Sequence, residues 1–341
     1  MTRASGFGRA ARALGLACTL LSCGKSTSST GAVAEQKPVE APRTTSREPL
    51  EALPAVPQLD PRVVALGRRL FHEPRLSGDD KVSCSSCHDL GKGGVDAKPL
   101  SLGVSGKLGL VNAPTVYNSS LNFVQFWDGR AATLEEQVGG PITNPIEMGS
   151  SWSKVLAALA KDPSYVADFA ALPGGVTEAN VRRAIADFER TLLTRGSAFD
   201  RFLAGDEKAL SSEARAGYEM FKSVGCIACH QGRNVGGNMF QRFGVLGDYF
   251  KDRGHVSDAD YGRYNVTHNE SDRYVFRVPS LRNVIHTAPY FHDGSAATLT
   301  QAVQVMARYQ LGRKLSDEQV REIIAFLSSL SGEQAPAGSK I

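Results

Sequence analysis

The feature that most constrains this chain is a five-residue pattern that occurs twice. Residues 84–88 and 226–230 both read Cys-x-x-Cys-His. In this pattern two thiols add across the vinyl groups of a haem, and the adjacent histidine ligates its iron. A redox disulfide or half of a zinc site also uses Cys-x-x-Cys, but neither requires a histidine directly after it. The repeated pattern predicts two covalent haem c groups. The residues that would attach and ligate them are Cys84, Cys87, His88, Cys226, Cys229 and His230.

A second repeat connects the two halves of the chain. Residues 114–134 align with residues 279–299, and both stretches contain Asp-Gly and close on Ala-Ala-Thr-Leu. Each half then ends in a helical pattern, at 176–193 and 315–330. The repeat predicts two copies of one haem domain. The expected fold is all-α, with tandem class I cytochrome c-like domains over residues 58–205 and 206–335.

The two predicted haems differ in their sixth ligand. After the second Asp-Gly, Met306 falls on the same helical face as Leu299 and Val303 and can point at iron. A methionine on an apolar face is more often core filling, but beside a Cys-x-x-Cys-His motif the ligand interpretation is favoured. The equivalent position in the first half is Pro141, which offers no ligand and should end its helix. This pattern predicts one closed haem for electron storage and one open haem for chemistry.

Three side chains near the open haem are candidates for that chemistry. Glu147 is a lone carboxylate among apolar residues, and breaking a peroxide O–O bond needs a group that moves a proton between its oxygens. The alternative for Glu147 is an exposed loop acid. Gln137 could donate a hydrogen bond to peroxide or be a solvated helix residue. Trp127 could carry electrons between two redox centres or simply pack.

The N-terminus carries an export signal. A basic start precedes a short apolar run that ends in Leu-Leu-Ser-Cys-Gly, so residues 1–22 are predicted to be a lipoprotein signal peptide and Cys23 the lipid attachment site. An ordinary cleaved signal is the alternative. Residue 24 is glycine, which favours the outer over the inner membrane. Residues 23–57, rich in Ser, Thr, Ala and Pro, are expected to be a flexible tether.

Charge and hydropathy exclude two classes of function. The chain has 39 Lys and Arg against 35 Asp and Glu, and removing the signal takes away three arginines, leaving (39 − 3) − 35 = +1. Basic runs are absent, so a nucleic-acid partner is not expected. No apolar stretch is long enough to span a bilayer. The prediction is a periplasmic, lipid-anchored protein.

From about residue 59 to 332 the sequence resembles the bacterial di-haem cytochrome c peroxidases, in the wider superfamily of the MauG enzymes. The motifs that carry the resemblance, beside both haem motifs, lie at 70–77 (LFHEPRLS), 112–116 (NAPTV), 126–130 (FWDGR), 140–149 (GPITNPIEMG), 278–284 (VPSLRNV) and 288–294 (APYFHDG). The resemblance implies an oxidoreductase that reduces hydrogen peroxide to water with electrons from small c-type cytochromes or cupredoxins. Dimers are common in the family, so a homodimer is among the expected states.

The resemblance also assigns roles to residues. It implies that the haem at 84–88 is the peroxidatic centre, with Glu147 as acid–base group and Gln137 as its companion. It implies that the haem at 226–230 receives electrons with Met306 as distal ligand, and that Trp127 lies between the haems. A calcium ion is implied between the domains; its matching positions are Asn112, Thr287 and Pro289.

One departure from the family pattern bears on activation. Many relatives carry, after the first haem motif, a histidine that occupies the peroxidatic iron at rest, whereas Val104 stands there in this chain. Valine has no lone pair, so the resting haem is expected to be five-coordinate or water-bound and active without prior reduction. Two alternatives keep the cofactors: a MauG-like enzyme that oxidises a protein substrate, and a non-enzymatic electron-transfer or sensor protein. Met306 argues against the former, and Glu147 with the missing first ligand against the latter.

Overall fold

The computed structural model describes residues 48–334 of the chain. The predicted signal peptide, Cys23 and the tether as far as residue 47 lie outside these residues. The described part is helix-rich with little strand, which confirms the helical prediction in its coarse form; a two-stranded antiparallel sheet was not predicted. Among residues 48–334, no helix has the length and apolar character needed to cross a membrane.

Six helices form the first half of the described chain: α1 (Pro61–Phe71), α2 (Cys84–Cys87), α3 (Leu134–Thr143), α4 (Trp152–Ala160), α5 (Pro163–Phe169) and α6 (Glu178–Arg190). The second half contains α7 (Ala198–Leu203), α8 (Ser212–Val224), α9 (Tyr249–Arg253), α10 (Tyr264–Thr267), α11 (Leu299–Val305) and α12 (Asp317–Ser329). Strands β1 (Phe240–Arg242) and β2 (Val275–Arg277) pair antiparallel, with Gln241 opposite Phe276.

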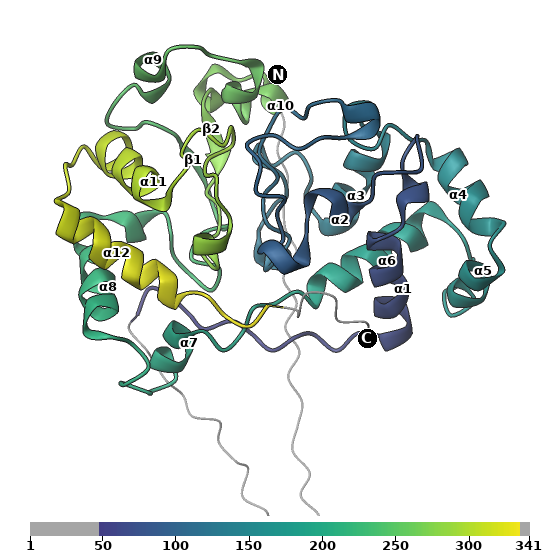
Figure 1. The fold of residues 1–341 in the computed structure, drawn as a ribbon, viewed down its shortest axis with the longest axis horizontal. Helices are drawn as coiled ribbons and strands as arrows, with labels where there is room; N and C mark the ends of the chain where they lie inside the picture. The colour runs from purple at the N-terminus through teal and green to yellow at the C-terminus, as the bar shows by residue number, and fades with distance from the viewer. Residues whose placement is uncertain (1–47, 335–341) are drawn as a thin grey trace, which may run out of the picture. The chain divides into compact units, whose positions relative to one another are not determined.

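Each half is built around one close helix pair, α1 with α6 and α8 with α12 (Figure 1). Local sequence starts these helices: Asp60 caps α1, whose first residue is Pro61, and Ser211 caps α8. A glycine in each helix pair allows the two helix backbones to pack closely against each other. A Cβ at Gly67 would lie 1.8 Å from the Ala184 carbonyl oxygen of α6, and one at Gly217 would lie 1.8 Å from the Glu322 carbonyl oxygen of α12.

Two large apolar clusters correspond to these helix pairs. The first is formed by residues between 63 and 192, and the second by Leu50 together with residues between 199 and 330. A small aromatic cluster of Tyr249, Phe250, Phe276 and Tyr309 adds Trp127 from the first half. The chain thus has a separate core for each sequence repeat, although the exact domain boundaries stay a prediction.

The sequence repeat recurs in backbone detail. Isolated β-bridges join Gln125 to Ala131 and, 165 residues later, Tyr290 to Ala296. Asn118 and Asn283 both adopt left-handed backbone conformations, with φ of 59° and 58°. Their side-chain amides donate to the same acceptor, Thr194 Oγ1, at 2.8 and 2.7 Å. Equivalent asparagines of the two halves therefore meet on a single threonine.

Main-chain hydrogen bonds join the halves reciprocally. The Asn112 N–H donates to the His292 carbonyl at 2.7 Å, and the Arg277 N–H donates to the Trp127 carbonyl at 2.8 Å. Asn112 and Arg277 are 165 residues apart, as are Trp127 and His292. The two bonds are therefore related by the repeat, and they place Trp127 beside His292, with ring centroids 6.4 Å apart.

The predicted tether extends too far along the chain. Leu50 is 1% exposed in the second core, and its backbone forms a parallel bridge with Gly232. The Glu51 carbonyl accepts from the guanidinium of Arg282, and the Leu53 N–H donates to Asp200. The segment from residue 48 therefore packs on the second half, because Leu50 is buried in the second core and backbone groups of the segment form hydrogen bonds with residues of that half.

Two helix predictions also need correction. Pro141 does not end its helix: α3 continues to Thr143 with Pro141 inside its last turn, where the lost N–H costs one bond near the end of the helix. Met306 is not on a regular α-helix. It follows α11 and begins a π-helical turn, Met306–Gln310, and such turns are frequent at functional sites.

Candidate active site

Both motif histidines are oriented by backbone carbonyls. His88 Nδ1 lies 3.3 Å from the Gly94 carbonyl oxygen, and His230 Nδ1 lies 3.3 Å from that of Val235. A carbonyl only accepts, so each Nδ1 carries the proton and each Nε2 keeps its lone pair. Burial lowers the pKa of His88 and lowers that of His230 to about 4. Both imidazoles are therefore neutral at pH 7 and suited to ligating iron.

The four motif cysteines form no disulfide with one another. Burial raises the pKa of Cys84 to about 12 and that of Cys226 to about 11. Among residues 48–334, the one group of three or more His, Cys, Asp or Glu gathered closely enough to hold a metal is Asp260, His292 and Asp293. The cysteine and histidine atoms of neither Cys-x-x-Cys-His motif lie that close together, and this argues against the zinc alternative.

A cavity of about 240 Å³ contains the second motif. Cys226, Cys229 and His230 lie in its wall together with Met306, and the remainder is largely aliphatic and aromatic. Paired thiols, a neutral imidazole and a thioether in one apolar cavity suit a haem c held through both faces. The observed placement of Met306 in the wall thus fits the role the sequence predicts for it.

Arg277 is a cavity residue that the sequence did not reveal. It is 3% exposed, and burial lowers its pKa to about 10. Its Nε donates to the Phe126 carbonyl at 3.1 Å, and within the described chain no carboxylate charge acts on its guanidinium. A buried guanidinium in the wall of this cavity suits the carboxylates of a porphyrin edge. Position 277 aligns with Asn112 in the first half, so the first half has a neutral side chain where the second half has a guanidinium.

Glu147 lies beside the first motif rather than on an open loop. It is partly buried in the turn that follows α3, and Asn144 Nδ2 donates to its Oε1 at 2.7 Å. Burial raises the pKa of Glu147, against the opposing effects of Arg130 and Asn144. Its charge also acts on Cys87, a thiol whose pKa is raised chiefly by burial. A carboxyl with a raised pKa near the first motif is suited to taking up and releasing a proton.

The loop that carries Val104 packs directly on the Glu147 turn. The Val104 N–H donates to the Glu147 carbonyl at 2.7 Å, and the Val104 side chain is 8% exposed. A Cβ at Gly103 would lie 2.1 Å from the Ile146 carbonyl oxygen, so only glycine permits this approach. Lys107 Nζ donates to the Pro145 carbonyl at 3.0 Å. The backbone of the Val104 loop is thus held against the turn that carries Glu147.

The remaining predicted residues lie as follows. Gln137 is partly buried on α3, upstream of the Glu147 turn, and within residues 48–334 the two side chains share no hydrogen bond. Trp127 lies in the wall of the second cavity, and its Nε1 donates to the Asn112 carbonyl at 2.9 Å. Asn144, which orients Glu147, had no role in the sequence prediction.

The three calcium positions, Asn112, Thr287 and Pro289, share that cavity wall with Trp127. Asn112 is 7% exposed, and its Nδ2 donates to the Lys98 carbonyl at 2.8 Å, so its side-chain oxygen points the opposite way. An amide oxygen and backbone carbonyls are ligands that calcium accepts. The residues fit the ion; its presence stays a prediction.

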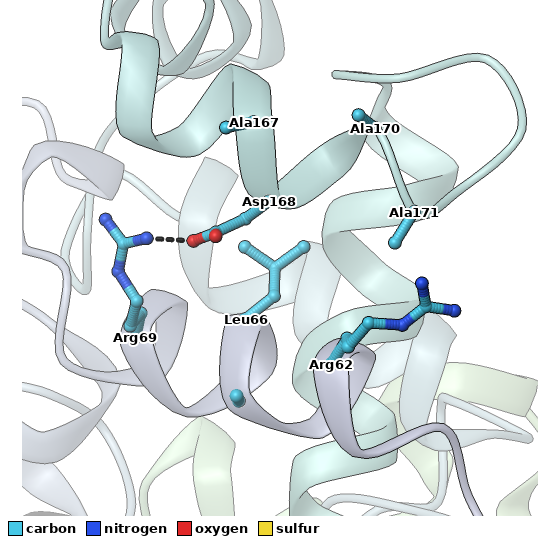
Figure 2. Close-up of a pocket in the computed structure, with 8 residues that line it drawn as sticks. Arg62, Leu66, Arg69, Ala167, Asp168, Ala170 and Ala171 are labelled. Carbon is cyan, nitrogen blue, oxygen red and sulfur yellow. Dashed lines mark hydrogen bonds and ion pairs between the residues drawn. The ribbon is translucent and has the colours of Figure 1, made fainter.

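A separate hollow of about 580 Å³ lies between α1 and α5 (Figure 2). Figure 2 shows Arg69 directed at Asp168 above Leu66, with three alanines on the facing segment. Arg69 also donates to Ser164, and Arg62 pairs with Asp60. Both arginines are already paired within the protein, so this hollow carries no reactive arrangement.

Comparisons with known proteins define the class of this chain. Residues 61–208 match the family model of the di-haem cytochrome c peroxidases. The chain is 46% identical over 291 residues to cytochrome c551 peroxidase of Nitrosomonas europaea, covering 85% of this chain and 86% of that protein. The cytochrome c551 peroxidase of Pseudomonas aeruginosa is 45% identical over 273 residues, covering 79% and 78%. The chain belongs to the di-haem cytochrome c peroxidase family, which confirms the resemblance and the enzyme class predicted from the sequence.

Three further similarities bear on this assignment. Cytochrome c peroxidase Ccp of Escherichia coli is 48% identical over 291 residues, but the chain spans only 62% of that protein's length. Among solved structures, a MauG-like protein associated with microbial copper homeostasis matches with a TM-score of 0.71 and 27% identity, covering 87% of this chain and 96% of that one. The di-haem peroxidase BthA of Burkholderia thailandensis matches with a TM-score of 0.70 at 20% identity, covering 83% and 90%, and supports the fold.

Proposed function

We propose that this chain reduces hydrogen peroxide to water, with two electrons supplied one at a time by a small c-type cytochrome or cupredoxin. The observation that carries the proposal is the asymmetry of the two sites. The first motif has a proton-active carboxyl, Glu147, and an apolar Val104 beside it, whereas the second has Met306 in its cavity wall. Relatives at 45–48% identity are named cytochrome c peroxidases.

The roles of the side chains follow from their places. Haem c, when bound, supplies the redox-active iron at each motif. Glu147 takes the proton from one peroxide oxygen and returns it to the other as the bond breaks, and Asn144 holds its carboxyl in position. Trp127, whose carbonyl accepts from Arg277 and whose ring lies beside His292, lies on the path for electrons entering through the Met306 site. Overall, two electrons and two protons convert one peroxide to two waters.

The experiment that tests the proposal is steady-state turnover of the fully oxidised protein with hydrogen peroxide and a reduced small cytochrome c. Turnover supports the peroxidase. Failure with several cytochrome and cupredoxin donors, both before and after reduction of one haem, contradicts it and favours a protein-oxidising or sensing role. The identity of Met306 already argues against the protein-oxidising alternative, in which a tyrosine would stand at that position.

We further propose that the resting enzyme needs no reductive activation, because Val104 cannot ligate iron. Wild-type protein should show a high-spin ferric signal by electron paramagnetic resonance and turn over without delay. Val104→His should convert this signal to low spin. It should also reduce turnover of the resting enzyme to below about a tenth of the wild-type rate, since the new histidine would leave the iron free for peroxide in only a minor fraction of the molecules. Val104→Ala is the matched control and should behave as wild type. Two low-spin haems in the resting wild type would overturn this proposal.

Calcium and the membrane anchor complete the proposal. One calcium ion held by Asn112, Thr287 and Pro289 should appear in the metal content of purified enzyme. Its removal by a chelator should lower activity, with recovery on adding calcium but not magnesium, which demands a stricter geometry.

The mature protein is proposed to be periplasmic and anchored through lipid on Cys23, which mass spectrometry of the N-terminal peptide would detect.

A further inference from the structure

The helix pairs α1/α6 and α8/α12 are built alike, so positions on α6 can be matched with positions on α12, and one matched position carries residues of different chemistry. Gly67 faces the Ala184 carbonyl and Phe188 Cβ of α6, and Gly217 faces the Glu322 carbonyl and Phe326 Cβ of α12. Phe188 therefore corresponds to Phe326, and the residue after each is Glu189 in the first half and Leu327 in the second. Leu327 lies in the wall of the cavity that contains the second haem motif. The first half thus has a carboxyl where the second has an aliphatic side chain.

Glu189 is buried among apolar side chains beside the first motif. It is 5% exposed on the face of α6 that packs into the first core, against which Cys84 also packs. Among the described residues no hydrogen bond acts on its carboxyl; only burial and the charges of Arg190 and Glu135 do. Two influences chiefly raise the pKa of Cys84: burial is the larger, and the charge of Glu189 comes second. The carboxyl therefore lies within electrostatic reach of a sulfur that would be joined to the haem.

The groups around Glu189 define its charge state. Burial raises the pKa of Glu189 to about 8; Arg190 on the same helix acts against this shift and Glu135 on α3 adds to it. Helix α2 contributes Cys84, and α1 contributes the apolar side chains of the first core. Arg190 is itself paired with Glu135 and Asp187, which weakens its effect. Glu189 accordingly holds a proton below about pH 8 and is ionised above it.

We propose that Glu189, where it is ionised, couples reduction of the first haem to uptake of a proton and so makes the reduction potential of that haem depend on pH. When the neighbouring haem gains one electron, the Glu189 carboxylate binds one proton from solvent and becomes a neutral carboxyl; on reoxidation the electron and the proton both leave. The added electron and the carboxylate are both negative, and in a buried site they repel each other strongly. This inference rests on the proposed function because it requires a haem held by residues 84–88.

The test is a redox titration of both haems in wild type and Glu189→Gln between about pH 6 and pH 10. Above about pH 8 the first haem of the wild type should lose up to tenfold in its reduction equilibrium constant per pH unit, which is about 59 mV for one electron. In E189Q its potential should stay flat over this range. Below that pH the two proteins should have similar potentials. The second haem should be unchanged in both.

Two further variants separate coupling from a general structural effect. Asp187→Asn removes an acid from the same helix that is already paired with arginines, and should keep the wild-type slope. Leu327→Glu should confer the slope on the second haem. Parallel pH profiles for wild type and E189Q, with haem bound, overturn the inference while leaving the peroxidase intact. Loss of haem from the wild-type first motif would instead contradict the proposed function.

Discussion

Replacing Glu147 with glutamine is expected to reduce peroxide turnover by about a thousandfold, within the range of 10²–10⁴ typical for loss of a general acid–base group. Glutamine keeps the size of the side chain and its contact with Asn144, but it can neither take up nor release a proton near pH 7. The haem content and the potential of the second haem should stay as in the wild type. Steady-state turnover at saturating peroxide measures the effect.

The pH dependence of turnover makes this prediction specific. Because burial raises the pKa of Glu147, the base form should be lost at a higher pH than for an ordinary glutamate as the pH falls. The acid limb of the wild-type profile should reflect this loss and be missing in E147Q. Glu213→Gln, which changes an exposed acid on α8, is the control and should match the wild type. A fall of less than tenfold in E147Q would remove Glu147 from the proton-transfer role.

Replacing Gly67 with alanine is expected to destabilise the protein by about 3 kcal/mol, at the upper end of the usual cost of overpacking. A glycine-to-alanine change inside a helix ordinarily stabilises it by about 1 kcal/mol. Here the sign reverses, because the new methyl group would lie 1.8 Å from a backbone carbonyl that cannot rotate away. Gly217→Ala should have a similar effect in the second half. Thermal unfolding should show a fall in Tm on the order of 5–10 °C.

Gly139 provides the matched control for these helix-crossing glycines. It also lies within a helix, but a Cβ there would meet the guanidinium end of Arg182 at 2.4 Å, a flexible group that can move aside. Gly139→Ala should therefore change Tm by much less than Gly67→Ala. If Gly67→Ala is as stable as the wild type, the close approach of α1 and α6 is not a requirement of the fold.

The sequence predicted the helical character, the internal repeat and the family because these rest on short-range patterns. Cys-x-x-Cys-His is a contiguous motif, and an alignment of 114–134 with 279–299 requires no knowledge of packing. Pro141 was misjudged because a proline near the end of a helix sacrifices only a bond close to the terminus. Leu50 was assigned to a tether because its short apolar segment has no period, although the second core covers it.

The missed residues depend on contacts between distant segments. Arg277 is one arginine among many in the sequence, and only the fold shows it buried in a cavity, with no carboxylate partner among residues 48–334. Glu189 carried a readable signal: it interrupts the apolar period of Ile185, Phe188 and Leu192 at a position where the second repeat has leucine. The last helices of the two halves align at an offset of 138 residues, not the 165 of the repeat 114–134 and 279–299, so an alignment of these two helices by themselves was needed to single it out.

The reciprocal bonds between the halves have a consequence for how this chain can change over time. They run from the N–H groups of Asn112 and Arg277 to the carbonyls of His292 and Trp127, so they belong to the main chain and survive most side-chain replacements. A duplicated unit joined in this way can keep its two copies in register while their interiors drift apart. Divergence of the two interiors then needs only local substitutions, and the contacts between the copies can stay unchanged.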